Sequence, residues 1–256
     1  MKNGTYRLHS RFDRVVNYAD NDGTLVSLVL PAIGAGPGNV IVHALPDPVP
    51  PQVEVSEEGI TFDSQTVSRA AMEAYDARLT IQRLPTLDEL AAHIRPLVPM
   101  CPQQSLAFLL DEEREKEFET DTQKALCKRT KEGVHCVVTG HYADGAHILK
   151  GLGYGLTPSG DDFLCGYLYA LALVDTRHAT RDTLFQAALG DNPIVNHFLD
   201  AAHKGLYYEH FKNFTRALCE GSPEESKDAF GALLSIGATS GTDTAAGLVI
   251  GLRLNR

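Results

Sequence analysis

The segment from Gly151 to Gly166, with the sequence GLGYGLTPSGDDFLCG, constrains the fold more than any other part of the chain. Glycines crowd its first half, and Asp161 and Asp162 then precede an uncharged, mostly apolar run that ends at Val174. A helix that is apolar on nearly all sides lies buried in the middle of a domain. The segment therefore predicts a glycine-rich turn that leads directly into a central, buried helix.

The pattern S-G-x-D-x-x-x-G occurs twice, once from Ser159 and once, 81 residues later, from Ser240. Four residues beyond the last glycine of each copy the chain again has a small residue, Ala170 in one and Gly251 in the other. Positions four apart lie on one face of a helix, so each copy predicts a narrow face that another helix can approach closely. We expect two central helices whose N-termini face a shared space, although two glycine-rich helix starts could also resemble each other by chance.

Residues 1–66 have the turn and strand signals of a small, mostly antiparallel β unit. Asp22-Gly23 marks one hairpin turn, and Glu57-Glu58-Gly59 marks a second one between two short strand segments. Residues 67–256 predict a mainly helical domain that carries both S-G-x-D segments. The expected class is therefore α+β, with the β unit first and the two glycine-entry helices buried in the helical domain.

Several stretches of the helical part have helix signals at their ends. Thr86 with Glu89 and Ser222 with Glu225 form capping boxes, and Asn192 before a proline is a candidate N-cap. The predicted helices run over 68–79, from Thr86, over 103–131, over 192–219, and from Ser222 to Gly237.

The net charge of −10 disfavours nucleic acid as a partner, because an acidic surface repels a phosphate backbone. The apolar run that ends at Val174 is far shorter than the ~20 residues of a membrane-spanning helix. Five scattered cysteines with no CxxC pair indicate reduced thiols, as in cytoplasmic proteins. We expect a cytoplasmic protein that acts on small molecules and binds neither nucleic acid nor membrane.

The glycine-rich segment indicates a site for a small anionic substrate. Glycines expose backbone N–H groups, and a helix N-terminus adds free donors and a partial positive charge that bind phosphate or carboxylate. The spacing matches neither the dinucleotide fingerprint nor the P-loop. The residues expected to bind the substrate lie at both helix starts: Lys150, Gly153, Gly155, Thr157, Ser159, Gly160, Ser240 and Gly241.

Asp161, Asp162 and Asp243 are the candidate catalytic residues. Their carboxylates could orient a substrate amide, whose N–H groups need acceptors, or hold a hydrated Mg²⁺ ion. They could also do no more than complement the helix dipoles. No HExxH segment or GxSxG elbow is present, so the sequence predicts neither a covalent nucleophile nor a resident metal or other cofactor.

The motif GLGYGLTPSGDDFLCG, together with the later S-G-x-D-x-x-x-G segment and the Gly-Pro-Gly-Asn turn at 36–39, resembles the AllH family. The resemblance implies a subunit of oxamate carbamoyltransferase, an enzyme of anaerobic allantoin and purine degradation, that works with an FdrA-like partner subunit. It also implies the conversion of oxalurate and phosphate into oxamate and carbamoyl phosphate. No catalytic residue carries over from the family, so the site residues above rest on their chemistry alone.

The sequence leaves more than one function open. In the first, the chain is a transferase subunit that moves a carbamoyl group in a site between the two S-G-x-D helix starts, together with partner subunits. In the second, it is a non-catalytic subunit that binds a small anion or shapes a partner's active site, which the missing general base and nucleophile favour. A third is Mg²⁺-dependent phosphoryl transfer at Asp161 and Asp162.

Overall fold

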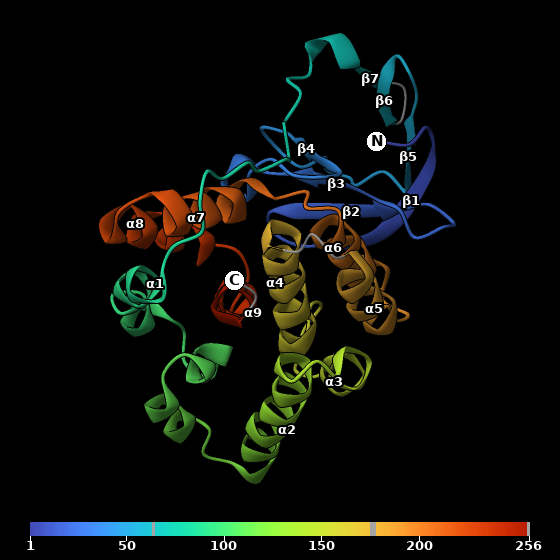
Figure 1. Cartoon of the computed structure of the whole chain (residues 1–256). Coiled ribbons are helices and arrows are strands. Elements are labelled where there is room, and N and C mark those ends of the chain that lie inside the picture. Colours follow the sequence, from blue (N-terminus) through green and yellow to red (C-terminus); the bar gives the residue numbers. More distant parts are fainter. Residues whose placement is uncertain (63–64, 175–177, 255–256) are drawn as a thin grey trace. The chain divides into compact units, whose positions relative to one another are not determined.

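The computed structural model describes residues 1–62, 65–174 and 178–254 (Figure 1). Contacts within the chain divide it into two compact units, one formed by residues 1–78 with 206–209 and the other by the remaining residues. The first unit is built on a β-sheet and the second is mainly helical, which confirms the predicted α+β class. The boundary predicted after residue 66 stays a prediction, because units defined by contacts are not independently folding domains.

The first unit contains a seven-stranded sheet in its described residues, in the order β4-β3-β2-β1-β5-β6-β7. All neighbouring strands are antiparallel except β3 and β4, which are parallel. The strands are β1 (Gly4–Arg11), β2 (Val15–Ala19), β3 (Leu25–Val29), β4 (Asn39–Ile41), β5 (Gln52–Val55), β6 (Gly59–Phe62) and β7 (Gln65–Ser68).

Local turn chemistry sets the register of the predicted hairpins. Between β2 and β3, Asp20 Oδ1 accepts the backbone N–H groups of Asp22 and Thr24, at 2.9 and 2.8 Å, while Gly23 takes a positive φ of 79°. Such a φ is open to glycine without steric cost, so the Asp22-Gly23 prediction is confirmed. One face of the sheet buries an apolar core, formed by Tyr6, Val16, Tyr18, Val26, Leu28, Val53 and Ile60.

The second unit is mainly helical, and its three described 3-10 turns all lie between the first two of its helices. No helix in the described residues combines the length and apolar character needed to cross a bilayer. The helices are α1 (Leu87–Ile94), α2 (Asp121–Val138), α3 (Tyr142–Leu149), α4 (Ser159–Val174), α5 (His178–Ala188), α6 (Pro193–His203), α7 (Glu209–Glu220), α8 (Pro223–Leu233) and α9 (Ser240–Leu254). The 3-10 turns are η1 (Pro31–Ile33) and η2 (Arg69–Ala71) in the first unit, and η3 (Val98–Met100), η4 (Leu106–Leu109) and η5 (Glu112–Glu117) in the second.

Capping signals located helix starts correctly. Both predicted capping boxes form: Thr86 and Ser222 each accept a backbone N–H, and the glutamate three residues later accepts theirs. Asn192 caps α6 by accepting the N–H groups of Ile194 and Val195. A cap depends on residues a few positions apart, so the sequence alone is enough to specify it.

Four helix predictions were wrong in extent, one of them only at its end, because α8 ends at Leu233 rather than at Gly237. Residues 68–79 form the end of β7, the turn η2 and mostly irregular chain. None of them is buried, so no tertiary packing stabilises a helix there. The predicted helix over 103–131 is broken into η4, η5 and α2, which begins at Asp121. The predicted helix over 192–219 is two helices, because Gly205 takes a positive φ of 65° and Leu206 then forms a β-bridge with Arg78.

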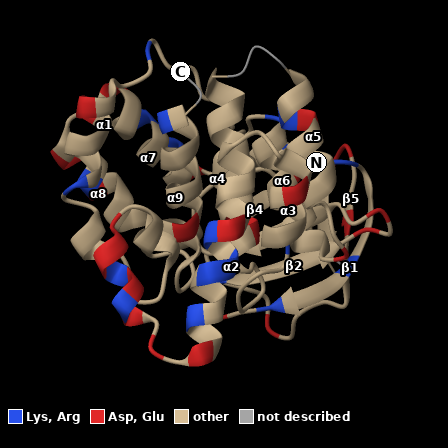
Figure 2. Ribbon diagram, turned by 60° about the horizontal axis from the view of Figure 1, so that its bottom comes forward, with Lys and Arg blue, Asp and Glu red and all other residues tan. Residues whose placement is uncertain are grey.

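The two glycine-entry helices are buried and lie side by side, as predicted (Figures 1 and 2). A Cβ on Gly166 of α4 would lie 1.9 Å from the carbonyl oxygen of Thr244, and a Cβ on Gly247 of α9 would lie 2.1 Å from that of Phe163. The contacts advance along both helices in the same sense, from Gly166 beside Thr244 to Ala170 beside Gly251. The helices are therefore parallel, and their N-termini lie at the same end.

The contacts across this pair are reciprocal. Gly166 approaches the backbone of Thr244 and Leu248, while Gly247 approaches that of Phe163 and Tyr167. Each partner is displaced from its counterpart by the same 81 residues that separate Ser159 from Ser240. The sequence echo is therefore a local two-fold relation in space, and chance similarity of two helix starts does not account for it.

Candidate functional site

The starts of α4 and α9 meet through their hydroxyl side chains. Thr157 Oγ1 and Ser240 Oγ form a hydrogen bond of 3.0 Å, which joins a residue two positions before α4 to the first residue of α9. The hydroxyl of Ser240 faces Asp162, and that of Ser159 faces Asp243. Each serine of the repeated pattern thus lies beside the aspartate of the other copy.

Asp161 is buried, with 3% of its surface exposed, and it fastens the glycine loop. Both of its carboxylate oxygens accept the backbone N–H of Gly151, each at 3.1 Å. Burial raises the pKa of Asp161 to about 6, although the Gly151 N–H and the nearby Lys150 charge oppose the shift. The Asp161 carboxylate therefore holds the start of the glycine loop, at Gly151, against the first turn of α4.

Asp162 is also buried, but it lacks such a partner. Its Oδ2 is inaccessible to water and makes no hydrogen bond within the described residues. Burial raises the pKa of Asp162 well above its usual range, and the charge of Asp243 raises it further. The Ser240 and Thr157 hydroxyls oppose the shift, yet neither bonds to Oδ2. A buried carboxyl in this state holds a proton more tightly than an exposed one.

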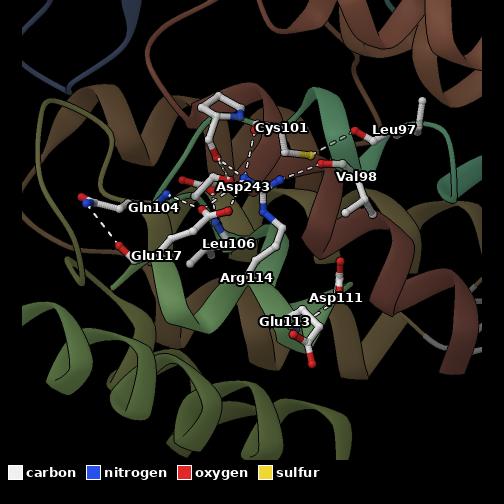
Figure 3. Close-up of polar contacts among 12 residues, drawn as sticks. Leu97, Val98, Cys101, Gln104, Leu106, Asp111, Glu113, Arg114, Glu117 and Asp243 are labelled. Atoms are coloured by element: carbon white, nitrogen blue, oxygen red, sulfur yellow. Dashed lines mark hydrogen bonds and ion pairs between the residues drawn. The ribbon is translucent and has the colours of Figure 1, made fainter. Parts of the chain in front are cut away.

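Asp243 is fully buried and has one strong backbone partner (Figure 3). Its Oδ1 accepts the N–H of Leu106 at 2.6 Å, across a sequence separation of 137 residues. Burial raises the pKa of Asp243 to about 6, while the Leu106 N–H opposes the shift. Its second oxygen, Oδ2, is buried without a hydrogen bond in the part of the chain that the structure describes.

Arg114 holds the segment that brings Leu106 to Asp243 (Figure 3). Its guanidinium donates to the carbonyl oxygens of Val98, Cys101 and Pro102, at 2.8, 3.0 and 2.9 Å. It also pairs with Glu117 at 3.1 Å. Five fixed donors let one arginine gather several carbonyls, so Arg114 serves as the clamp of a segment with little regular hydrogen bonding of its own.

Two carboxylate oxygens at these helix starts, Asp162 Oδ2 and Asp243 Oδ2, have no hydrogen-bond partner within the described residues, and the hydroxyl of Thr242 faces the thiol of Cys101. Asp162, Asp243 and Thr242 are all more than nine-tenths buried. Buried polar groups nearly always have a hydrogen-bond partner, and leaving one without a partner costs about 1–3 kcal/mol. The unpaired carboxylate oxygens make these helix starts the candidate site.

The open donors of the site lie in the glycine loop rather than in the first turn of α4. The N–H groups of Gly160, Asp161 and Asp162 donate to the carbonyl oxygens of Leu152 and Pro158. By contrast, the backbone N–H groups at positions 153–157 donate to no atom of the described residues. Successive free N–H groups in a loop of this kind form an anion-binding concavity.

Positive φ angles of 125° at Gly153 and 91° at Gly155 shape this loop. A Cβ on Gly153 would lie 2.7 Å from the backbone nitrogen of Ser159, so the loop folds back closely onto the helix start. A Cβ on Gly155 would meet nothing within 4 Å, which leaves its surface open. Of the two predicted binding glycines, Gly155 therefore leaves the backbone open to a ligand, whereas Gly153 allows the loop to pack against the helix start.

Other predicted substrate-binding residues have structural contacts. Lys150 Nζ donates to the carbonyl oxygens of Ala187 and Leu189 at the end of α5, at 3.0 and 2.7 Å. Gly160 and Gly241 pack directly against backbone carbonyls, where a Cβ would lie 2.0 and 2.6 Å from an oxygen atom. Their role in binding stays a prediction, and these contacts give each of them a second reason to be present.

The charge distribution around the site is simple. Apart from Asp161 and Asp162, α4 carries no charged residue, and its ribbon is uncoloured over most of its length in Figure 2. Within the described residues, no three His, Cys, Asp or Glu side chains come together as metal ligands. The two helix N-termini contribute partial positive charge, which Asp162 and Asp243 face at close range.

Sequence reasoning missed two members of the site. Leu106 contributes only a backbone N–H, which any residue except proline carries, so its identity gave no signal. Thr242 occupies the variable position of the S-G-x-D pattern, and only the structure shows that its hydroxyl is buried and faces the thiol of Cys101. Asp161, Asp162 and Asp243 do come together, along with Thr157, Ser159 and Ser240.

Comparison with known proteins adds an independent finding. The family model described as "Oxamate carbamoyltransferase subunit AllH" matches residues 149–252, from just before the glycine loop to near the end of α9. No curated protein and no solved structure matches the chain. The resemblance inferred from the two glycine motifs is thus confirmed: the region that carries the candidate site is similar to the AllH family, the oxamate carbamoyltransferase subunit AllH.

Proposed function

We propose that this protein is a subunit of a carbamoyltransferase that converts oxalurate and phosphate into oxamate and carbamoyl phosphate. The reaction takes place at the starts of α4 and α9, in an enzyme completed by an FdrA-like partner subunit. Its setting is the degradation of allantoin and purines in the cytoplasm. The family match supports the transferase class and the multi-subunit assembly, and the chemistry of the site supports the choice of substrate.

One observation carries the proposal: open donors and unpaired acceptors occur next to each other. The free N–H groups of positions 153–157 suit an anionic group, and Asp162 Oδ2 and Asp243 Oδ2 suit N–H groups. Oxalurate has a carboxylate at one end and a ureido group at the other. A site with both kinds of partner can hold such a molecule in one orientation.

The transfer breaks one bond and forms one. A phosphate oxygen attacks the terminal ureido carbonyl carbon of oxalurate, and the bond from that carbon to the oxamoyl nitrogen breaks. The nitrogen takes up a proton and leaves as the NH₂ group of oxamate, while the carbamoyl group leaves on phosphate. Holding the two reactants in line supplies a large part of the rate, because it replaces a bimolecular encounter.

Asp162 is the residue best suited to supply the proton. A carboxyl group whose pKa is raised by its surroundings holds a proton that it can give up as a general acid. Burial, together with the charge of Asp243, raises the pKa of Asp162 well above its usual range. Asp243 orients the substrate nitrogen through its free oxygen, and Asp161 keeps the glycine loop in place.

A second function, a non-catalytic subunit that binds a small anion, is favoured by one specific observation. Two of the three acids hold backbone N–H groups, at Gly151 and Leu106, so each has a structural role that needs no chemistry. In this case the active site lies on a partner subunit. The two functions predict different effects of Asp162→Asn on turnover.

The test is Asp162→Asn in the complex assembled with its partner subunits. We expect carbamoyl phosphate formation from oxalurate and phosphate to fall by about 10²-fold or more, the usual contribution of a general acid, with no loss of thermal stability. Asp228→Asn, on the exposed face of α8, is the control and keeps wild-type activity. Wild-type turnover in Asp162→Asn would leave the chain a binding subunit and exclude our catalytic assignment.

A further inference from the structure

We infer that a groove along the basic face of α2 is a docking site for an acidic segment of a partner subunit. The groove belongs wholly to the second unit, and none of its residues takes part in the proposed reaction. That a partner subunit exists rests on the proposed function. The acidic chemistry of the docked segment rests on the charges and the shape of the groove.

The groove lies between α2 and the chain that precedes it, and its volume is about 410 Å³. This volume falls within the range of roughly 300–1,000 Å³ typical of pockets that bind small molecules, so a few peptide side chains fit inside. The residues that carry its charge and form its floor are Glu115, Phe118, Lys124, Cys127, Lys128 and Lys131.

Three of these residues, Lys124, Lys128 and Lys131, form a lysine row along α2. Spacings of four and three residues place them on one side of a helix. Figure 2 shows Lys and Arg gathered along α2. The rise per residue of a helix makes the row about 10 Å long, which an extended peptide covers with about three residues. The row therefore matches a short run of acidic side chains better than one small anion.

Two lysines of the row have no acidic partner. Lys131 pairs with Glu115, and Glu132 at the edge of the groove pairs with an arginine of α2 at 3.4 Å. The ammonium groups of Lys124 and Lys128 are exposed, and they make no ion pair or hydrogen bond within the described residues. The groove thus keeps two unmatched positive charges in a chain whose net charge is −10.

A segment of another chain suits these charges better than a free ion does. An ion pair that stays in water is screened and contributes little to binding. A peptide that covers the groove excludes water from the pairs and packs against the apolar stems of the lysines. Carboxylates joined in one segment also bind together, because the first pair holds the second close by. The acidic balance of this chain disfavours a second copy of itself or a nucleic acid as the occupant.

The opposite face of α2 supports the glycine loop. Gly133 lies on the far side of the helix from the lysine row, and a Cβ there would lie 2.6 Å from Leu149 Cγ at the end of α3. The carbonyl oxygen of Leu149 in turn packs against Gly160 of α4, where a Cβ would lie 2.0 Å from it. A subunit docked on α2 would therefore contact the helix that packs behind the candidate site.

The first experiment titrates the purified full-length chain with fluorescein-labelled hexaglutamate and follows fluorescence anisotropy. We expect Lys124→Gln/Lys128→Gln to bind this peptide about fivefold or more weakly than the wild type, because both unmatched charges are gone. Glutamine retains helix propensity, so thermal stability should not change. Raising NaCl from about 0.05 to about 0.3 M should weaken wild-type binding more than that of the variant.

The matched control is Lys204→Gln/Lys227→Gln, which removes the same charge at the end of α6 and on α8. Each of these lysines already pairs with an acid three or four residues away, at 2.7 and 3.5 Å. The control should bind hexaglutamate within about twofold of the wild type, since exposed pairs contribute little. Equal binding by Lys124→Gln/Lys128→Gln and the wild type would overturn the inference. So would inorganic pyrophosphate that binds the wild type as tightly as hexaglutamate, because the groove would then be a small-anion site.

The second experiment measures assembly of the chain with the FdrA-like subunit by analytical ultracentrifugation. We expect Lys124→Gln/Lys128→Gln to assemble about fivefold or more weakly than the wild type and the control. Unchanged assembly of this variant would overturn the docking site while leaving the proposed function in place. A wild-type complex that assembles through these lysines but forms no carbamoyl phosphate would contradict the proposed function and leave the docking site standing.

Discussion

The starts of α4 and α9 share one sequence pattern, one direction and one set of reciprocal backbone contacts, yet their acids have different surroundings. Asp243 Oδ1 accepts the backbone N–H of Leu106 at 2.6 Å, while Asp162 faces only the hydroxyls of Ser240 and Thr157; the Oδ2 atom of each acid has no partner within the described residues. The α4 start is preceded by an open glycine loop, and the α9 start is covered by the segment that Arg114 clamps. A repeated motif therefore reproduces helix geometry, and distant segments decide which copy stays open to a ligand.

This difference explains why the two acids are not interchangeable. A carboxylate that accepts a buried backbone N–H satisfies that group and contributes to stability. A carboxylate without such a partner is itself a cost to the folded state, tolerated where function requires it. By this reasoning α9 carries the anchored half of the site and α4 the reactive half.

The largest effect should come from breaking the helix pair on which the comparison rests. Gly166→Ala and Gly247→Ala each place a Cβ about 2 Å from a backbone oxygen of the other helix, at 1.9 and 2.1 Å. We expect a loss of about 3 kcal/mol or more in each, because backbone atoms cannot move aside as a flexible side chain can. Chemical denaturation of the purified variants measures this loss.

The matched control is Gly231→Ala in α8, whose Cβ would meet only Met100 Cε, at 3.8 Å. Alanine there should stabilise the helix by roughly 0.5–1 kcal/mol. If Gly166→Ala and Gly247→Ala differed widely in their effects, the local two-fold relation of the pair would have no energetic counterpart.

A smaller effect should separate the two acids themselves. Asp243→Ala leaves the buried Leu106 N–H without an acceptor, so we expect a loss of about 1–3 kcal/mol in the free energy of unfolding. Asp162→Ala removes a carboxyl that lacks such a partner, and its stability should change by less than half as much. Thermal and denaturant unfolding of both variants provide the comparison. Equal losses would show that the hydrogen bond to Leu106 does not distinguish the two helix starts.

The smallest effect is a difference in pH dependence. Burial raises the folded-state pKa of Asp243 to about 6, so its protonated form favours the folded protein. The resulting stability is fully present below the unfolded pKa, near 4, and is lost as the pH rises through about 6. We expect the melting temperature of the wild type to fall over this window by more than that of Asp243→Asn. The corresponding difference in the free energy of unfolding is on the order of 1 kcal/mol.

Asp162→Asn refines the same measurement. The pKa of Asp162 is raised well above its usual range, so the pH-dependent loss that this variant removes should occur at higher pH than the loss removed by Asp243→Asn. Both acids are compared in melting curves of the ligand-free chain at several pH values. Identical pH profiles for the wild type and both variants would contradict the raised pKa values and the assignment of Asp162 as the proton donor.

Local signals in the sequence were reliable where a few neighbouring residues decide the outcome. Thr86, Asn192 and Ser222 cap their helices as predicted, and Asp22-Gly23 turns between β2 and β3. The predictions over 68–79 and 192–219 failed where tertiary contact decides, since residues without a buried face gain little from helical propensity. Helix propensity alone could not reveal the break at Gly205 or the β-bridge that follows it.

The sequence by itself determined that two apolar helices would be buried against each other. Each begins with an S-G-x-D segment and has small residues along one face. The reason is physical: glycine at positions four apart leaves a helix face that only another backbone can fill. Only the tertiary structure decided that Leu106 anchors Asp243, that Asp162 Oδ2 stays unpaired and that the open donors belong to the loop at 153–157. Hydrogen-bond satisfaction depends on every segment that reaches the site, and partners such as backbone N–H groups leave no trace in residue identity.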